Sequence, residues 1–486
     1  MLISFDRASF AHPGAGARAT LSNITWILEE GQTWAITGPT GSGKTTFAEA
    51  IRGRMRRLAG EADWPIVRRA RETDPRVRIP EDIIERVSFH DSSRAFSPSN
   101  HYYQQRFNFI DPEDDMTVRQ YLASVGDLDP AEVERVAATL WLTPLIDDSL
   151  IELSTGQMRR ARIARALLER PEILILDDAA IGLDVEVRRE LVELLGGLVA
   201  DGLRSIVVVR PDSIPEWVTH VAELRDGRLA FSGPRGDYCP VVESLAPITT
   251  KPRSIGDVDG PTIVELEGAT VRYGDKAILS GVDWRICEGQ RWALTGPNGS
   301  GKTTLLSLIC GDHPQAYSQK VTMFGRRRGT GETIWDVRRP IGLVSPEMHF
   351  YFSEPLSVLE TVGTGLFDVM VRKPLTSPQE ALIRERLAVA GLGDMAERRF
   401  RTLSMGEQRL ALLVRAMVKD PRLLILDEPF QGLDTKTIGR MITHLEATLQ
   451  PEQTLILVTH DDAEIPPSVS HRLRLREGRV VGRAGE

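Results

Sequence analysis

The chain has 486 residues, of which 41% are hydrophobic, and a formal net charge of −8 at pH 7. At roughly 150 to 250 residues per α/β domain this length predicts two domains, and the composition excludes disordered and fibrous classes. The acidic balance argues against nucleic acid as the main partner, because binding a phosphate backbone normally needs a basic excess.

Neither the cysteines nor the apolar runs indicate a secreted or membrane-spanning chain. The cysteines lack metal-ligand or disulfide spacing, so we interpret them as small buried hydrophobes in a reducing cytoplasm; they are Cys239, Cys287 and Cys310. The start lacks a signal-peptide pattern, and no run approaches the about 18 apolar residues that a transmembrane helix needs. We expect a cytoplasmic protein that lies at the inner face of the cell membrane only if a partner chain holds it there.

The first elements in chain order are antiparallel strands, predicted by the alternation around Ile3 and Phe5 and by the run Ile24 to Leu28. A strand-like segment, Trp34 to Ile36, then precedes a glycine-rich loop and a helical stretch, which is the context of a phosphate-binding P-loop. Backbone N–H groups of such a loop wrap nucleotide phosphates, its lysine reaches the β and γ oxygens, and the next hydroxyl ligates Mg²⁺. The predicted nucleotide-binding residues are Gly38, Pro39, Thr40, Gly41, Ser42, Gly43, Lys44, Thr45 and Thr46.

A mostly helical insertion is predicted between His90 and Leu150, because apolar positions recur at helical spacing from Ala131 to Leu142. It ends at LSTGQMRRARIARALL, Leu153 to Leu168, where Ser154 is a good N-cap for an amphipathic basic helix. A helix N-terminus with small residues presents N–H groups to an anion. This second phosphate-binding element must serve another phosphate or the nucleotide of another subunit.

An apolar strand from Ile173 ends in Asp177 within ILILDDAAIGLD, which continues to Asp184. A buried parallel strand of this kind brings a carboxylate to its C-terminal edge, where α/β sheets place their ligands. We predict that Asp177 holds Mg²⁺ through water and that Asp178 faces the attacking water.

The second half of the chain repeats every one of these parts. LSMGEQRLALLVRAM from Leu403 repeats the small-residue turn, LLILDEPFQGLD from Leu423 repeats the strand with Asp427 and Glu428, and LILVTHDD contains His460. One P-loop sequence can arise by chance, but a second copy in the same order identifies a tandem repeat of nucleotide-binding units. The second set of predicted nucleotide-binding residues is Gly296, Pro297, Asn298, Gly299, Ser300, Gly301, Lys302, Thr303 and Thr304.

Two aromatic residues before the P-loops are candidates for stacking on adenine. Phe10 lies in the opening strands, and Tyr273 of VRYGD holds the matching place in the second half. A core position is the alternative for Phe10, and the sequence does not separate the two, whereas stacking is favoured for Tyr273.

The motifs of both halves resemble those of ATP-binding cassette (ABC) ATPases, with two cassettes in one polypeptide. The resemblance implies an α/β fold with two P-loop NTPase (ABC ATPase) domains, each with a RecA-like core, an antiparallel β subdomain and a helical subdomain. We expect domain 1 at residues 1–245, a linker at 246–262 and domain 2 at 263–486.

The resemblance also implies Mg²⁺-dependent ATP hydrolysis by a monomer whose cassettes form a head-to-tail sandwich. Each ATP then lies between the P-loop of one cassette and the signature turn of the other. The expected signature contacts are Ser154, Gly156 and Gln157 for the ATP at Lys302, and Ser404, Gly406 and Glu407 for the ATP at Lys44. The expected metal-site residues are Thr45, Thr303, Asp177 and Asp427, and the expected catalytic residues are Glu428, His460 and Asp178.

Departures from the family pattern predict one competent and one degenerate ATP site. Asp178 stands where the second half has Glu428, and no histidine lies between Val207 and Ser213 to match His460. The glutamine normally found after the strand before the helical insertion is also missing from both halves, where His90 and Pro346 stand. Since that glutamine contacts Mg²⁺ and conveys movement to a membrane subunit in transporters, ordinary transporter coupling is in doubt.

Three kinds of partner remain open. The leading one is a membrane permease for an oxyanion such as molybdate, because Gly311 to Ser345 resembles tandem ATPases associated with molybdate transport genes. The second kind of partner is the ribosome, on which some soluble tandem ABC proteins act. Those proteins have a long charged helical linker, whereas residues 246–262 of this chain are few and rich in Pro, Gly, Ser and Thr, which argues against this class. DNA handling would rest on Arg326 to Arg328, which we interpret as solvated, so no specific nucleic-acid binding is expected.

Overall fold

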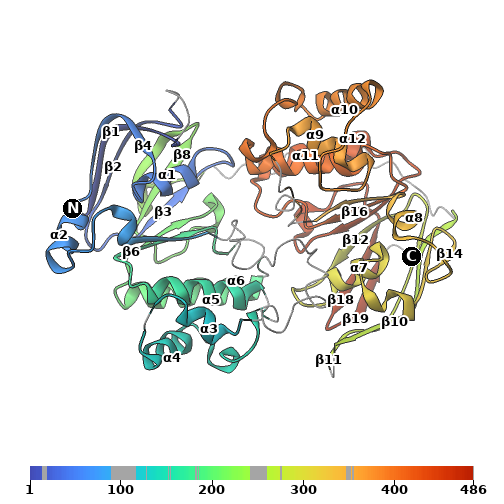
Figure 1. The fold of residues 1–486 in the computed structure, drawn as a ribbon, viewed down its shortest axis with the longest axis horizontal. Coiled ribbons are helices and arrows are strands. Elements are labelled where there is room, and N and C mark those ends of the chain that lie inside the picture. The colour runs from blue at the N-terminus through green and yellow to red at the C-terminus, as the bar shows by residue number, and fades with distance from the viewer. Residues whose placement is uncertain are drawn as a thin grey trace. The chain divides into compact units, whose positions relative to one another are not determined.

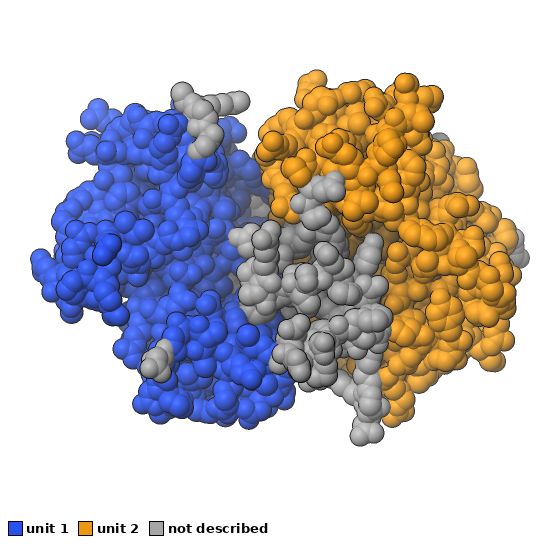
Figure 2. Space-filling view, in the orientation of Figure 1, with its two compact units in different colours: residues 1–98, 109–242 blue, residues 99–108, 243–486 orange. Residues whose placement is uncertain are grey.

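The structure is a computed structural model of residues 1–486. It describes residues 1–13, 19–88, 116–126, 128–150, 153, 155–180, 183, 185–240, 260–273, 276–345, 348, 352 and 355–484. The described residues up to 240 form one compact unit, and those from 260 onward form a second (Figure 2). They are called unit 1 and unit 2. The predicted linker lies mostly outside the described residues.

Unit 1 combines an antiparallel sheet with a larger, mainly parallel sheet (Figure 1). The antiparallel sheet has the order β2-β1-β4, with β1 Ile3–Ala11, β2 Leu21–Leu28 and β4 Arg56–Asp63. The second sheet has the order β5-β6-β7-β3-β8-β9, and its strands are parallel except for the antiparallel pair β8 and β9. They are β3 Trp34–Thr37, β5 Ile84–Ser88, β6 Ile173–Asp177, β7 Ser205–Val208, β8 His220–Arg225 and β9 Arg228–Pro234.

Six α-helices belong to the described part of unit 1: α1 Lys44–Ile51, α2 Pro65–Thr73, α3 Val118–Ala123, α4 Pro130–Thr139, α5 Thr155–Leu168 and α6 Val185–Ala200. Short 3₁₀ turns are η1 Pro80–Asp82, η5 Thr143–Leu145, η7 Pro211–Ser213 and η8 Arg235–Asp237. Helices α3 and α4 pack on α5 (Figure 1) and confirm the helical character of the described part of the predicted insertion.

Unit 2 repeats this architecture. Its antiparallel sheet has the order β11-β10-β13-β14, with β10 Thr262–Tyr273, β11 Lys276–Cys287, β13 Lys320–Met323 and β14 Arg326–Arg327. Its main sheet has the order β15-β16-β17-β12-β18-β19, with β12 Arg291–Thr295, β15 Ile341–Val344, β16 Leu423–Asp427, β17 Thr454–Val458, β18 His471–Arg476 and β19 Arg479–Ala484. The two main sheets share one strand order, so matching positions in the two units can be assigned strand by strand.

The helices of unit 2 are α7 Lys302–Cys310, α8 Ile334–Arg338, α9 Val358–Gly363, α10 Ser377–Val389, α11 Met405–Met417 and α12 Thr435–Thr448. Its 3₁₀ turns are η9 Pro314–Ser318, η11 Thr364–Leu366, η12 Gly393–Met395, η13 Phe400–Thr402 and η14 Asp462–Glu464. Among the described residues of the whole chain, no helix is long and apolar enough to cross a membrane.

Each unit has two apolar cores, one on each face of the main sheet. In unit 1 the first core joins the antiparallel sheet to α1 through Phe5, Trp26 and Phe47. Burying such side chains stabilises each by about 1.5–3 kcal/mol, which fixes α1 and the loop before it. Cys287 and Cys310 are buried as expected, but Cys239 is exposed, because it follows the surface turn η8.

Candidate nucleotide-binding sites

The P-loop connects the end of β3 to α1 in unit 1 and the end of β12 to α7 in unit 2. Gly38 and Gly296 have φ angles of 135° and 145°, and a Cβ on either would lie 2.1 or 2.2 Å from a backbone oxygen of the neighbouring strand. Only glycine fits at these positions. The two loops also close with the same turn, in which Ser42 and Ser300 each donate a backbone hydrogen bond of 3.2 Å to the proline three residues earlier.

The two lysines of the P-loops have matching positions. Lys44 Nζ donates to the carbonyl oxygens of Gly38 and Pro39 at 2.8 and 2.9 Å. Lys302 Nζ donates to those of Gly296 and Pro297 at 2.7 and 2.9 Å. Each ammonium therefore lies over its own loop, at the place where phosphate oxygens would meet the backbone N–H groups. Both P-loops are formed as the sequence predicts.

Asp177 and Asp427 end the matching strands β6 and β16. Both are buried, and Asp177 has no exposed surface. The hydroxyl of Thr45 donates to Asp177 Oδ2 at 3.2 Å, which joins two of the predicted metal-site residues of unit 1. Hydroxyl and carboxylate oxygens suit Mg²⁺, so the donor chemistry of Thr303 with Asp427 in unit 2 fits that ion.

The next residue in each unit has the same unusual backbone. Asp178 and Glu428 have φ angles of 57° and 43°, in the left-handed region that non-glycine residues rarely adopt. Their amides donate to the carbonyls of Val208 and Val458, both at 3.0 Å. The backbone therefore presents Asp178 and Glu428 in the same way, and at this position the two units differ only in the length of the side chain.

Glu428 contacts two polar side chains of unit 2. Gln431 Nε2 donates to Glu428 Oε2 at 3.1 Å, and His460 Nδ1 lies 3.9 Å from Glu428 Oε1. The side chain of Glu428 is 13% exposed and that of His460 is 20% exposed, so both reach the surface at the end of the sheet. The structure brings these two predicted catalytic residues together.

The corresponding place in unit 1 is occupied by an arginine. His460 follows Val458, the last residue of β17, by two positions, and Arg210 follows Val208, the last residue of β7, by two positions. Arg210 thus holds the chain position of His460, and its Nε lies 4.0 Å from Asp212 Oδ1. The missing histidine is evident from the sequence, but Arg210 is recognised as its counterpart only when the ends of β7 and β17 are matched.

A second arginine of unit 1 was missed altogether. Arg86 on β5 contacts Asp177 Oδ2 through Nε at 3.1 Å and through Nη2 at 2.7 Å. Its Nη1 donates to Glu49 Oε1 of α1 at 2.6 Å. The sequence shows only a single cationic residue within a short strand. It does not indicate that this strand pairs with β6, the strand that ends in Asp177.

The signature turn of unit 2 is a capping box. Ser404 Oγ accepts from Glu407 N at 3.4 Å, and Glu407 Oε2 accepts from Ser404 N at 2.7 Å. Gly406 is buried, and a Cβ on it would lie 2.7 Å from Thr437. The Glu407 carboxylate, predicted to bind ATP, is thus engaged in capping its own helix.

The signature turn of unit 1 is described only in part. Gly156 is buried like its counterpart, and a Cβ on it would lie 2.8 Å from Val187. Gln157 is half-buried in the first turn of α5. Ser154 and Asp184 lie outside the described residues, as do His90 and Pro346 of the two altered loops.

Behind each signature turn lies a buried arginine. Arg159 of α5 contacts the carbonyl of Ala179, and Arg409 of α11 contacts the carbonyl of Ser345 at 3.2 Å. Burial lowers the pKa of each guanidinium to about 10, so both stay charged at neutral pH. These contacts attach each signature helix to the main sheet of its own unit.

Phe10 is a core residue, which was the alternative interpretation. It is 1% exposed, and its ring centroid lies 5.1 Å from that of Phe5. In the pairing register Phe10 matches Val271 of β10, not Tyr273. The residue that matches Tyr273 is His12, which is exposed. The assignment of Phe10 to adenine stacking is therefore corrected, because its side of the strand faces the core.

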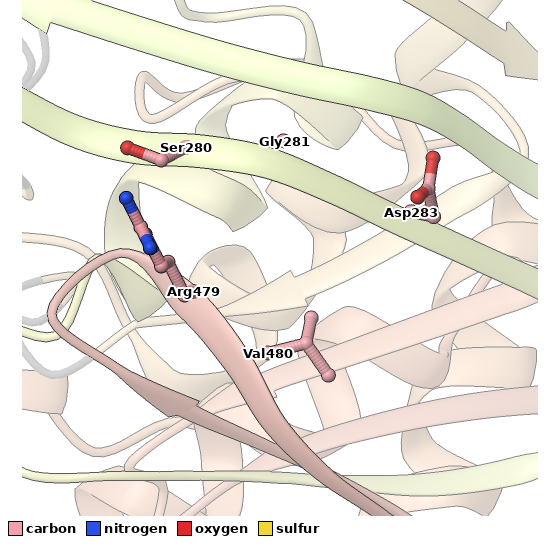
Figure 3. Close-up of a pocket in the computed structure, with 5 residues that line it drawn as sticks. All are labelled: Ser280, Gly281, Asp283, Arg479 and Val480. Carbon is pink, nitrogen blue, oxygen red and sulfur yellow. The ribbon is translucent and has the colours of Figure 1, made fainter.

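Figure 3 shows a pocket in unit 2 that is separate from this chemistry. Its walls come from β11 and from the start of β19, and it contains no P-loop residue and no candidate catalytic carboxylate. The lining residues are Ser280, Gly281, Asp283, Arg479 and Val480.

Comparison with known proteins defines the class. The family model described as ABC transporter matches residues 21–181 and 279–431, which is more than half of the chain. The chain belongs to this family and is an ATP-binding, ATP-hydrolysing protein with two cassettes. The predicted fold class and tandem organisation are confirmed.

Similar proteins extend over nearly the whole chain. An uncharacterized ABC transporter ATP-binding protein of Schizosaccharomyces pombe is 34% identical over 472 residues, covering 94% of this chain and 95% of that protein. The ABC transporter ATP-binding protein ModF of Escherichia coli is 35% identical over 476 residues, covering 93% of each. A chain in a model of ribosome-bound archaeal Pelota and ABCE1 matches 98% of this chain and 77% of its own, with a TM-score of 0.61 and 19% identity, which shows a common fold alone.

Proposed function

We propose that this protein is a tandem ABC ATPase in which one ATP site turns over and the other is degenerate. The competent site combines Lys302, Asp427 and Glu428 of unit 2 with the signature turn of unit 1. The degenerate site combines Lys44 and Asp178 with the signature turn of unit 2. Closure of the two cassettes on ATP would then perform work on a partner.

The observation that carries this proposal is the difference between Glu428 with His460 and Asp178 with Arg210. Phosphoryl transfer depends mainly on positioning and on stabilising charge, so a carboxylate must reach the attacking water. Asp178 starts from the same backbone position as Glu428 but is one methylene shorter. A displacement of about 1 Å in such a group can lower the rate roughly a hundredfold.

Mg²⁺ fits the donor set of the competent site. Thr303 and Asp427 supply the hydroxyl and carboxylate oxygens that would hold it, directly or through water. Bound there, Mg²⁺ neutralises charge that develops on the phosphate oxygens. Lys302 adds a fixed positive charge, and Glu428 orients the water and accepts its proton.

Two conservative variants test the asymmetry. Steady-state ATPase activity of Glu428→Gln should fall to nearly nothing, whereas Asp178→Asn should retain most of the turnover. Each variant replaces a carboxylate by its amide, so steric changes are matched. Equal losses in the two variants, with nucleotide still bound, would refute the proposal.

The partner we propose is a membrane permease, with an oxyanion such as molybdate as the solute. Support comes from membership of the ABC transporter family and from the segment Gly311 to Ser345, which resembles molybdate-associated tandem ATPases. The tagged protein, purified from its own cells, should bring a permease subunit with it. Recovery of ribosomes instead would support the alternative class of soluble ABC ATPase, and recovery of neither would contradict both.

A further inference from the structure

The nucleotide site of unit 1 contains a buried network of charged side chains next to its P-loop. Arg86 is 11% exposed, Glu49 is 14% exposed and Asp177 is fully buried. The guanidinium of Arg86 bridges the two carboxylates, at 2.7 Å from Asp177 Oδ2 and 2.6 Å from Glu49 Oε1. Arg52 Nη1 lies 3.4 Å from the same Glu49 oxygen. Arg52 is shared with a further carboxylate, because its Nη2 lies 3.4 Å from Glu85 Oε2, whereas Arg86 joins Glu49 to Asp177.

Unit 2 is built differently at the same positions. In the parallel register Arg86 pairs with Ile175, two residues before Asp177, and Leu343 pairs with Ile425, two residues before Asp427. Leucine therefore takes the place of Arg86 and cannot supply a cation.

The position of Glu49 differs as well. Glu49 follows Lys44 by five residues, and Ser307 follows Lys302 by five. Ser307 is buried, and its hydroxyl donates to the Thr304 carbonyl of its own helix at 2.7 Å. The charged network of unit 1 thus has a leucine and a serine as its counterparts in unit 2.

Arg86 is placed so that it changes the charge that a nucleotide meets. A carboxylate beside the β and γ phosphates repels them, and in a partly buried site this repulsion is strong unless a cation lies between the charges. Arginine keeps its charge at every physiological pH and binds carboxylates in a fixed planar geometry. In unit 1 the cation is part of the chain, and it contacts the carboxylate oxygen that accepts from Thr45.

We propose that Arg86 substitutes for the charge of the divalent cation at Asp177, so that unit 1 holds ATP without Mg²⁺ while unit 2 requires the metal. This inference rests on the proposed binding of ATP by both P-loops. The degenerate site then has a structural role, because it keeps its ATP bound when the concentration of free Mg²⁺ is low. Slow turnover follows as well, because a fixed guanidinium stabilises bound phosphate but does not bring a metal to the Thr45 hydroxyl.

Binding of ATP to full-length chains with one P-loop disabled separates the two sites. Lys302→Ala reports on unit 1, and Lys44→Ala reports on unit 2. Equilibrium dialysis with labelled ATP is carried out with Mg²⁺ and with EDTA in its place. On removing Mg²⁺ we expect Kd to rise less than about tenfold in unit 1 and more than about a hundredfold in unit 2.

The matched control copies the unit 2 pair into unit 1. Arg86→Leu alone leaves two buried carboxylates without their bridging cation and endangers folding, so the variant to use is Arg86→Leu with Glu49→Ser, in the Lys302→Ala background. Circular dichroism and thermal unfolding check that it is folded. Its ATP binding should become as dependent on Mg²⁺ as that of unit 2.

The possible outcomes distinguish the two proposals. No ATP at unit 1 with or without Mg²⁺ would overturn the proposed two-site function. ATP at unit 1 only with Mg²⁺ would overturn this inference alone. Binding without Mg²⁺ that survives the double replacement would overturn the role assigned to Arg86. If the double variant does not fold, the comparison of the two single-site chains still decides whether unit 1 needs the metal.

Discussion

His460 lies beside Glu428 at the end of the main sheet of unit 2, with Nδ1 3.9 Å from Oε1 of the carboxylate. Gln431 donates to the other carboxylate oxygen at 3.1 Å. The group that would polarise the attacking water is therefore positioned by two neighbours, from the segments after β16 and β17. Unit 1 has Arg210 at the position of His460, and this difference gives the first prediction.

Replacing His460 by alanine should lower steady-state ATP turnover by about 10² to 10⁴, because a positioned polar group next to the reacting phosphate is lost. Arg210→Ala is the matched control at the equivalent position and should leave most of the turnover. A colorimetric phosphate assay at saturating ATP measures both. Similar losses in both variants would mean that the two sites contribute equally.

Lys44→Ala and Lys302→Ala should each remove ATP binding at one site. Each ammonium faces phosphate charge in a largely enclosed loop, so its loss should weaken ATP at that site by about 2–5 kcal/mol. Calorimetry in a Glu428→Gln background should give two ATP per wild-type chain and one tight ATP per lysine variant. A stoichiometry of one without either lysine change would contradict the two-site description.

Arg328 is predicted to stabilise unit 2, contrary to the sequence interpretation that the whole run Arg326 to Arg328 is solvated. Arg328 is 4% exposed, with Nη1 3.7 Å from Glu332 Oε1 and its guanidinium 5.4 Å from the ring centroid of Tyr317. Its removal takes away the cation beside Glu332, a half-buried residue whose carboxylate keeps its backbone hydrogen bonds from Gly329 and Thr330. The packing on Tyr317 is lost as well, so Arg328→Ala should lower the free energy of unfolding by about 1–3 kcal/mol. Arg326→Ala, at an exposed position, should change it by less than about 0.5 kcal/mol in the same urea titration.

DNA binding by this segment should be weak, because two of its three arginines are exposed and the third is buried. Exposed cations on an acidic chain bind phosphate backbones without sequence preference, and this binding falls steeply with salt. Fluorescence anisotropy with duplex DNA should show affinity only at low ionic strength. Sub-micromolar, sequence-selective binding at physiological salt would contradict this expectation.

His313 should make unit 2 less stable as the pH falls. Its side chain is buried and accepts from Gln315 N at 3.1 Å, and burial lowers its pKa below the ordinary value. Between that lowered pKa and the unfolded value of about 6.5, the unfolded chain binds a proton that the folded chain does not. The free energy of unfolding therefore rises with pH through this window. The contribution of His313 to that free energy is complete above the unfolded pKa.

His313→Asn keeps an acceptor for the Gln315 amide and removes the titrating group. Urea unfolding at about pH 7.5 and about pH 5.5 should show a smaller loss of stability on acidification in the variant than in the wild type. His444, whose pKa burial also lowers, remains in both proteins, so part of the pH dependence should persist. An unchanged pH dependence would show that His313 titrates normally in the folded chain.

The local motifs could be predicted from the sequence because each one is determined by residues that are neighbours in the chain. A P-loop needs glycines at the positions where φ is positive, and Gly38 and Gly296 have those angles. A run of apolar residues that ends in a carboxylate predicts a buried strand, and β6 and β16 are such strands. Repetition of both motifs in the same order was enough to predict the two cassettes.

Contacts between distant segments could not be predicted in this way. Arg86 meets Asp177 across 91 residues and Glu49 across 37 residues, and the partner of a charged side chain depends on strand order and register. The same holds for Phe10, whose side of the strand was decided by its pairing with β2, and for Arg328, which is buried while its two neighbours are exposed. The sequence by itself determined which chemical groups each unit has at its P-loop and at the end of the strand that carries Asp177 or Asp427. Tertiary structure alone decided which charges neutralise one another there, because side chains from separate strands meet only when the sheet has formed.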